Sequence, residues 1–330
     1  MTPAKGKVSN KANPVTKTKV AAPDPKEISA GVRNKADTGI CEKCRGSHYL
    51  LTNHEGHVQG ELCECFSCPE CEGRGHVYIE DETGISSMRE CVCAGLVQRL
   101  KKVGDAGIPG KFVTTKLETY HPIDASQKLA LRVAHDFVKD FGTSQQGLLF
   151  MGRPGLGKTH LAVAVIKMLI LDKRADCKFV DFFQLLSDIR YGYSQDLSEQ
   201  AIINPYVAAP ILLIDELAKG RNTEWELTML DQIISSRYNA ADKITLFTTN
   251  YPDQAPNPKK GGKNESHKEF GSSREALVSE ETLQDKVGER IYSRLVEMCR
   301  FVKLEGIDYR QEMQGKQTAP ARSRPAKRRS

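Results

Sequence analysis

The chain has 330 residues, of which 39% are hydrophobic and 27% are charged, and its formal net charge is +6. This composition indicates a folded globular body and excludes a wholly disordered chain. The apolar stretch at residues 161–171 contains Lys167 and is too short to cross a bilayer, so we expect no membrane partner. The N-terminus has no apolar signal segment, and we therefore expect a cytoplasmic protein.

The positive charge is concentrated at the two ends of the chain. Residues 1–38 hold eight Lys/Arg against three Asp/Glu, and residues 311–330 hold six against one. Both segments are rich in Pro, Ala, Ser or Thr and poor in apolar residues, so we expect disordered basic tails. Such tails could hold nucleic-acid phosphate or could only aid solubility, and both interpretations stay open.

Eight of the ten cysteines form an internal repeat. Each copy is a Cys-x-x-Cys pair followed by a Cys-x-Cys pair, and between the pairs the sequence has strand–turn–strand character, with turns near residues 55–56 and 82–84. This spacing can place four sulfurs around a tetrahedral Zn²⁺, so it predicts two structural zinc ions. The candidate ligands are Cys41, Cys44, Cys63 and Cys65 in the first copy, and Cys68, Cys71, Cys91 and Cys93 in the second.

Two alternatives concern these cysteines. A disulfide framework would need an oxidising compartment, which nothing in the sequence indicates. The zinc pairing could be successive, or it could be interleaved, with Cys41, Cys44, Cys91 and Cys93 on one ion, which resembles DnaJ-type cysteine-rich domains. With either pairing, thiolates make the module acidic, which favours docking to a protein over gripping DNA.

Residues 152–159 read Gly-x-x-x-x-Gly-Lys-Thr, the pattern of a nucleotide phosphate loop. They follow the apolar run 148–151 and open a helical stretch, which is the context such a loop requires. Lys158 would reach the β- and γ-phosphates of ATP, and the Thr159 hydroxyl would ligate Mg²⁺. The candidate nucleotide-binding residues are Gly152, Arg153, Pro154, Gly155, Leu156, Gly157, Lys158, Thr159 and His160.

Two further apolar runs end in polar side chains. Residues 211–216 end in Asp215, suited to the Mg²⁺ shell, and in Glu216, suited to polarise the attacking water. Residues 243–250 end in Asn250, which could contact the γ-phosphate or the water, although Asn before Tyr-Pro is also ordinary turn chemistry. We therefore take Asp215, Glu216 and Asn250 as candidate catalytic residues.

The strand and helix patterns alternate along the chain. Strands are expected at 147–151, 178–182, 211–215, 244–249 and 300–304, with helices between them, which predicts an α/β fold with a parallel sheet flanked by helices. A small zinc-binding β-hairpin module precedes this sheet. The expected organisation is a tail at 1–38, a double four-cysteine zinc module at 39–95, a linker helix at 96–110, an ATPase domain at 111–310 with a disordered loop at 253–280, and a tail at 311–330.

Several segments resemble the DnaC/DnaI-type helicase loaders, which are AAA+ ATPases related to the replication initiator and to IstB-type transposition helpers. The resemblance covers residues 96–310 and is carried by 157–162, 214–217, 248–250, 288–295 and 302–310. It implies that Arg294 is an arginine finger reaching the ATP site of a neighbouring subunit, with Arg290 as the second candidate. It also implies that Arg310 is a sensor arginine, although no helical lid follows, which suggests weak hydrolysis by the protein alone.

The resemblance implies a loader that binds a replicative DNA helicase through the zinc module and uses ATP to place it on single-stranded DNA. Self-association through the ATP sites would complete each site. Residues 190–193 mix Arg190 with two tyrosines and could contact single-stranded DNA, but packing is the favoured interpretation. The alternatives are an IstB-type transposition helper, which usually lacks a zinc module, and a zinc-bearing chaperone-like adaptor with a nucleotide switch, which the Asp215–Glu216 pair disfavours.

Overall fold

The computed structural model describes residues 41–80, 85–91, 93–240, 242–253 and 281–309. The two predicted basic tails lie outside these residues, and so does Arg310. The predicted loop 253–280 also lies outside them, apart from Asp253.

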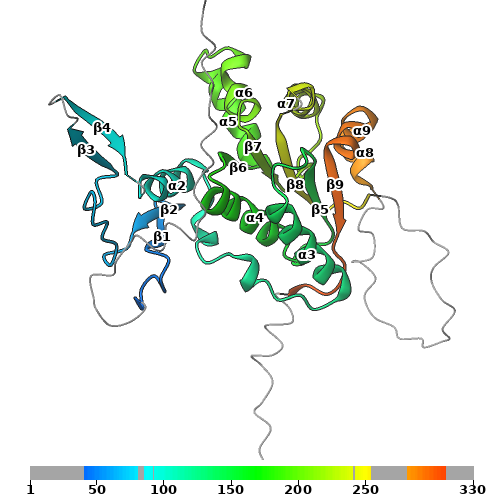
Figure 1. The fold of residues 1–330 in the computed structure, drawn as a ribbon. Helices are drawn as coiled ribbons and strands as arrows, with labels where there is room; N and C mark the ends of the chain where they lie inside the picture. The colour runs from blue at the N-terminus through cyan, green and yellow to red at the C-terminus, as the bar shows by residue number, and fades with distance from the viewer. Residues whose placement is uncertain (1–40, 81–84, 92, 241, 254–280, 310–330) are drawn as a thin grey trace, which may run out of the picture.

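A five-stranded sheet forms the centre of the larger body (Figure 1), and its strand order is β6-β7-β8-β5-β9. All four neighbouring pairs are parallel, so the predicted α/β fold is confirmed. The predicted strand positions agree with the structure to within one residue. The strands are β5 (Gly147–Met151), β6 (Cys177–Asp181), β7 (Ile211–Asp215), β8 (Ile244–Thr249) and β9 (Cys299–Lys303).

Helices cover both faces of this sheet, because alternate strand residues point to opposite faces. Leu148 and Phe150 of β5 belong to one buried cluster, whereas Leu149 and Met151 belong to the other. The first cluster lies under α2 (Ala94–Asp105), α3 (Ala125–Lys139) and α4 (Lys158–Lys173). The second lies under α5 (Phe182–Ser194), α6 (Glu199–Val207), α7 (Glu224–Ala240), α8 (Leu283–Val287) and α9 (Glu289–Met298).

The connection from α2 to α3 is anchored by a buried lysine of α4. It contains two short 3-10 helices, η1 (Gly110–Phe112) and η2 (Leu117–Thr119). The ammonium group of Lys167 donates hydrogen bonds to the backbone carbonyls of Phe112, Val113 and Thr115 at 2.8–2.9 Å. Burial lowers the pKa of Lys167 to about 8. These bonds hold the connection against the helix that follows the phosphate loop.

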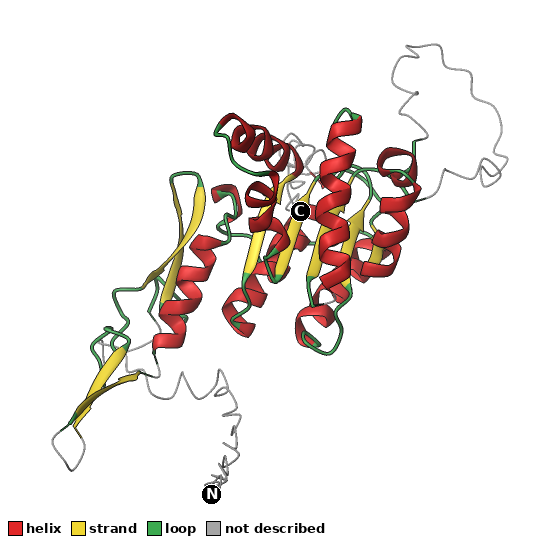
Figure 2. Ribbon diagram, turned by 90° about the horizontal axis from the view of Figure 1, so that it is seen from above, coloured by secondary structure: helices red, strands yellow, loops and turns green. Residues whose placement is uncertain are grey.

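Two antiparallel hairpins precede the sheet. β1 (Tyr49–His54) pairs with β2 (His57–Leu62), and the predicted turn at 55–56 is present, with positive φ at both Glu55 and Gly56. β3 (His76–Glu80) pairs with β4 (Ser86–Glu90), and most of its turn lies outside the described residues. Figure 2 shows the first hairpin alongside α2 and the second projecting beyond that helix.

A helix falls where the linker was predicted, but α2 ends at Asp105, and residues 106–109 continue without helix. Across the described part of the chain, the helices are too short or too polar to cross a membrane.

Arg237 of α7 is fully buried and ties three segments together. Its guanidinium donates to the Thr245 hydroxyl and to the carbonyls of Tyr206, Ala209 and Ile244 at 2.6–2.9 Å. Burial lowers its pKa to about 10. The fully bonded guanidinium therefore replaces the water that these buried carbonyls would otherwise need.

We expect the Arg237→Met substitution to lower the free energy of unfolding by about 3 kcal/mol or more, because it leaves several buried carbonyls without donors. Chemical denaturation would measure the loss. Arg132→Met changes an exposed arginine of α3 and should leave the free energy of unfolding nearly unchanged. Equal effects of the two substitutions would contradict the role assigned to Arg237.

Candidate functional site

A cavity with a volume of about 680 Å³ lies at the carboxyl ends of β5, β7 and β8. This is the edge at which parallel α/β sheets bind ligands. Most of the predicted site residues meet there. The cavity is lined by Pro154, Gly155, Leu156, Gly157, Lys158, Thr159, His160, Asp215, Glu216 and Asn250, together with Lys111, Phe112, Thr115, Thr119, Tyr120, His121, Gln127, Asp181, Lys219, Thr248 and Tyr309.

The phosphate loop connects β5 to α4 and depends on glycine at a tight position. Gly157 has a φ of +82°, a backbone conformation that favours glycine, and a Cβ there would lie 2.5 Å from the ring of Tyr120. Both the backbone conformation and the lack of space therefore exclude a side chain. The ammonium group of Lys158 donates to the backbone carbonyls of Gly152 and Arg153 at 2.7 and 2.8 Å. The loop is therefore folded around Lys158, with the helix N-terminus directed at the cavity.

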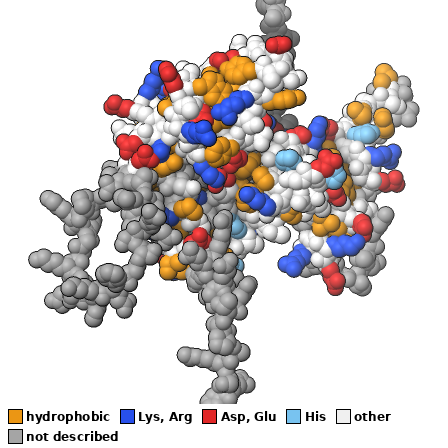
Figure 3. Space-filling model, turned by 180° about the vertical axis from the view of Figure 1, so that it is seen from behind, with side chains coloured by type: hydrophobic (Ala, Val, Ile, Leu, Met, Phe, Trp, Pro, Cys, Tyr) orange, Lys and Arg blue, Asp and Glu red, His pale blue; other side chains and the backbone are white. Residues whose placement is uncertain are grey.

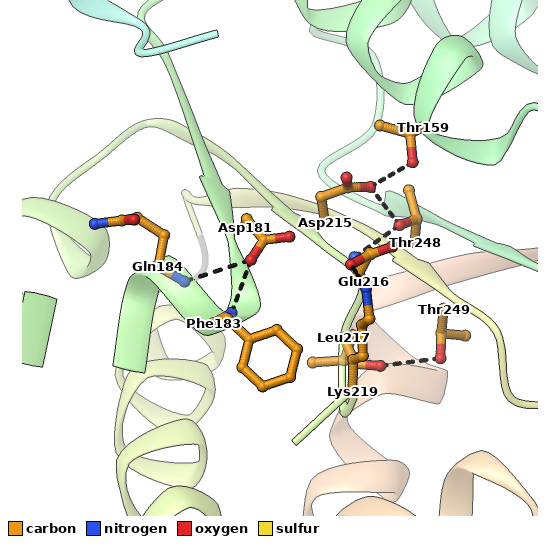
Figure 4. Close-up of polar contacts among 10 residues, drawn as sticks. All are labelled: Thr159, Asp181, Phe183, Gln184, Asp215, Glu216, Leu217, Lys219, Thr248 and Thr249. Carbon is orange, nitrogen blue, oxygen red and sulfur yellow. Dashed lines mark hydrogen bonds and ion pairs between the residues drawn. The ribbon is translucent and has the colours of Figure 1, made fainter. Parts of the chain in front are cut away.

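The carboxylate of Asp215 is the centre of a hydrogen-bonded array (Figure 4). Its Oδ1 accepts from the hydroxyl of Thr159 at 2.8 Å and from that of Thr248 at 2.6 Å. Burial raises the pKa of Asp215, against the effect of these two hydrogen bonds. A hydroxyl and a carboxylate placed together are oxygen ligands of the kind that Mg²⁺ prefers, so these residues fit the predicted ion.

Glu216 follows directly in a strained turn. It has a φ of +57°, in the left-handed region, and its backbone N–H donates to the Thr248 hydroxyl at 2.9 Å. Its carboxylate forms an ion pair with Lys219, which also lines the cavity. Sequence reasoning assigned no role to Thr248 or Lys219. Ile214 of β7 pairs with Phe247 of β8 in parallel register, so the residues that follow them, Asp215 and Thr248, lie beside each other. This pairing is the feature that could have indicated a role for Thr248.

His160 and the end of the described chain form the walls of the cavity. The Nε2 of His160 lies 2.8 Å from the carbonyl of Lys116, and burial lowers the pKa of this imidazole. On the other side, the N–H of Tyr309 donates to the carbonyl of Gly155 at 3.2 Å. A Cβ on Gly155 would lie 2.0 Å from the carboxyl carbon of Asp308, so this wall touches the phosphate loop.

The two candidate finger arginines lie outside this cavity, on α9. Asp231 of α7 accepts a 2.7 Å hydrogen bond from Arg294 and forms a 3.4 Å ion pair with Arg290. Arg290 is the more exposed, at 73% of its side chain against 21% for Arg294. Neither arginine lines the chain's own cavity. A contribution of either one to the site of a neighbouring subunit stays a prediction.

The eight cysteines of the repeat form two separate groups. Cys41, Cys44, Cys63 and Cys65 make one, and Cys68, Cys71, Cys91 and Cys93 make the other, with the sulfurs of each group within 4.8 Å of one another. This is the successive pairing and not the interleaved one. A tetrahedral site with Zn–S bonds of about 2.3 Å needs sulfurs about 3.8 Å apart. Contacts of 3.1–3.8 Å between cysteines are close to that spacing, and all eight are free thiols.

In each group, hydrogen bonds favour the thiolate form of one cysteine, Cys44 in the first and Cys71 in the second. Burial would raise the pKa of Cys44, but hydrogen bonds from Cys65 and the backbone outweigh it and lower the pKa to about 7. In the second group, the backbone N–H of Gly75 donates to the sulfur of Cys71 at 3.2 Å. The donor set and its surroundings therefore fit a structural Zn²⁺ in each group.

Comparison with known proteins identifies the fold around the nucleotide cavity. Residues 148–270 match the model of the AAA family, the ATPases associated with various cellular activities. This segment is an AAA-type ATPase domain. The matched residues include the phosphate loop, β7 and the Glu216 that follows it, and β8 and the Asn250 that follows it.

Several of the similar curated proteins are named replicative helicase loaders. The chain is 26% identical over 137 residues to the replicative helicase loader DnaC of Buchnera aphidicola subsp. Baizongia pistaciae, a match that covers 41% of this chain and 55% of that protein. It is 24% identical over 144 residues to DnaC of Escherichia coli K12, covering 43% and 58%. The chain thus spans little more than half the length of these relatives.

Solved structures also match. The crystal structure of the DnaC helicase loader matches with a TM-score of 0.47 and 27% identity, covering 59% of this chain and 99% of that one. The crystal structure of DnaI matches with a TM-score of 0.45 and 20% identity, covering 61% and 93%.

We expect Glu216→Gln to lower the rate of ATP hydrolysis by about 100-fold or more, because an amide cannot accept the proton of the attacking water. Nucleotide binding should be kept, since Lys158 and Thr159 are unchanged. Phosphate release and the equilibrium binding of a fluorescent ATP analogue would measure the two properties. Glu224→Gln, an exposed change on α7, is the matched control, and hydrolysis that survives in Glu216→Gln would exclude Glu216 as the base.

We expect the zinc affinity of the first cysteine group to fall steeply as the pH falls. Burial and neighbouring thiols raise the pKa of Cys65, so Zn²⁺ must displace its proton at neutral pH, and Cys44 becomes protonated below about pH 7. Affinity should therefore be about 100-fold or more weaker at pH 6 than at pH 8. Competition with a chromophoric zinc chelator would measure it, and a pH-independent affinity would show that thiols are not the ligands.

Proposed function

We propose that this protein is an ATP-dependent loader of a replicative DNA helicase. The observation that carries the proposal is the array of Thr159, Asp215, Thr248 and Glu216 at the edge of an AAA-type sheet. Several curated relatives of this part of the chain are named replicative helicase loaders. The names of these relatives indicate a replicative helicase as the partner, and the array of side chains is suited to ATP hydrolysis.

The cavity is suited to hydrolysis of ATP. Lys158 and the backbone N–H groups of the loop would bind the phosphates, and Thr159 and Asp215 would hold Mg²⁺, which neutralises phosphate charge. Glu216 would take a proton from the attacking water, and Asn250 would orient that water or the γ-phosphate. The ion pair with Lys219 holds the Glu216 carboxylate in place before substrate arrives.

Assembly of several copies would complete each site. Arg294 would leave Asp231 and reach the phosphates bound to a neighbouring subunit, where a planar and permanently charged guanidinium stabilises the charge that develops. The two copies would meet through different surfaces, which generates a ring or a helical row. Arg290 is the second residue that could serve, and Arg310 would contact nucleotide from its own chain.

The second cysteine group is the proposed docking element for the helicase, with Zn²⁺ fixing its shape. Its hairpin exposes several apolar side chains, and Figure 3 shows them gathered at the projecting tip. Exposed apolar patches on a soluble protein often mark interaction sites. Tyr78 and Met88 stand opposite each other in the register and are 69% and 66% exposed. Apolar and aromatic residues of this kind supply most of the binding energy of protein interfaces.

Single-stranded DNA is the proposed second partner. Of residues 190–193, Arg190 is held by an ion pair with the buried Glu226 and by the ring of Trp225, 4.8 Å away. Tyr191 is 67% exposed at the end of α5 and is the aromatic side chain available for stacking on a base.

A capture experiment tests the loader proposal. Immobilised protein with ATP and Mg²⁺ should retain a bacterial replicative helicase hexamer, and the double substitution Tyr78→Ser with Met88→Ser should weaken retention by about tenfold or more. Leu129→Ser removes a similarly exposed apolar residue from α3 and should not weaken it. Failure of the wild-type protein to retain the helicase would overturn the proposal, and equal retention by all variants would place docking elsewhere.

A further inference from the structure

The two cysteine groups differ in how they are connected to the ATPase body. Val58 of the first hairpin is fully buried in the same cluster as residues of α3, α4 and the sheet, and Leu51 packs against that cluster. The second group forms a small cluster of its own, in which its cysteines pack with Phe66 and Val77. Every described residue of β4 is exposed.

The first hairpin is hydrogen-bonded to the chain segment that follows α2. The N–H of Val58 donates to the carbonyl of Ile108 at 2.8 Å, and the N–H of Gly110 donates to the carbonyl of Gly56 at 2.7 Å. The packing between them is close, because a Cβ on Gly110 would lie 2.1 Å from the side-chain oxygen of Asn53. The hairpin thus fixes both the backbone and the position of residues 108–110.

This same segment continues directly into the wall of the nucleotide cavity. The N–H of Phe179 in β6 donates to the carbonyl of Ala106 at 2.8 Å, which anchors the start of the segment to the sheet. Lys111 and Phe112, which follow it, line the cavity. Lys167 holds the carbonyl of Phe112 from the other side. The wall is therefore clamped between the first hairpin and α4.

The cysteines of the first group lie at the open end of this hairpin, which is opposite its turn. Tyr49 pairs with Leu62 at the open end of the hairpin, and the N–H of Cys63 donates to the carbonyl of His48 at 2.9 Å. Cys44 and Cys65, whose sulfurs lie 3.3 Å apart, flank this end. An ion bound there would close the end of the hairpin, and its loss would free both strands.

We propose that the first cysteine group is the metal-dependent support of the nucleotide pocket, whereas the second group has no part in nucleotide binding. This proposal rests on the ATP binding proposed above. Zn²⁺ held by Cys41, Cys44, Cys63 and Cys65 fixes the first hairpin, and the hairpin fixes the wall at Lys111 and Phe112. Because the coupling between two binding affinities is reciprocal, bound nucleotide must in turn raise the affinity of the first group for zinc. We expect this gain to appear as slower release, because nucleotide would hold the wall at Lys111 and Phe112 and, through it, the first hairpin.

The test measures zinc release into excess chromophoric chelator, with and without a non-hydrolysable ATP analogue and Mg²⁺. The paired variants remove equivalent Cys-x-x-Cys pairs: Cys68→Ser with Cys71→Ser leaves the first group, and Cys41→Ser with Cys44→Ser leaves the second. In the wild-type protein we expect the analogue to slow the release of one of two zinc ions by about fivefold or more. The same slowing should occur in the variant that keeps the first group and be absent from the variant that keeps the second.

The outcomes separate this proposal from the proposed function. Equilibrium binding of the analogue to the wild-type protein is measured in parallel. Binding without any change in zinc release overturns the coupling and leaves the ATPase proposal standing, whereas absence of binding overturns both. Slowed release from the second group alone would also overturn the coupling. The wild-type protein and the variant that keeps the first group suffice for the test if the other variant does not fold.

Discussion

The nucleotide site depends on one carboxylate oxygen, Oδ1 of Asp215, which accepts hydrogen bonds from hydroxyls on two neighbouring elements. Thr159 comes from the first turn of α4 and Thr248 from β8, while Asp215 ends β7. Their meeting requires the parallel register that sets Ile214 beside Phe247. A slip of one residue would turn every side chain of a strand to the opposite face of the sheet, so packing of the two cores fixes the catalytic geometry. The backbone N–H of Glu216, bonded to the same Thr248, makes the position of the base depend on that register too.

The sequence was enough to predict the strands and the phosphate loop because their signals are local. An apolar run of five residues, or glycines before Lys158 and Thr159, carries its meaning without reference to the rest of the chain. Thr248 and Lys219 were not assigned because their roles arise from contacts. Thr248 acts through the neighbouring strand, and Lys219 reaches Glu216 through a turn in which Glu216 and Ala218 both have positive φ. Few residues other than glycine adopt that conformation, so composition gives little indication of it.

In the cysteine repeat, too, the local spacing predicted part of the structure, and the rest depends on contacts between distant residues. The spacing of the pairs predicted two tetrahedral groups but was compatible with successive or interleaved sharing of the ions. The hairpins decide between the two, since pairing of Tyr49 with Leu62 carries Cys63 and Cys65 back to Cys44. The attachment of the first hairpin to the ATPase core had no signal in the sequence. It depends on Val58, the buried one of two apolar residues in a six-residue strand, and such a residue does not reveal what will cover it.

This attachment determines how the docking surface can be located. Removing all residues before Leu96 would take away both cysteine groups, but it would also remove Val58 from the core, at a cost of about 2 kcal/mol. It would also leave the carbonyl of Ile108 and the N–H of Gly110 without their partners, beside the wall of the nucleotide cavity. Loss of helicase capture by such a truncation would therefore report a damaged ATPase as readily as a missing docking surface. Substitutions at Tyr78 and Met88 avoid this ambiguity, because both side chains are exposed on a hairpin that lies outside that core.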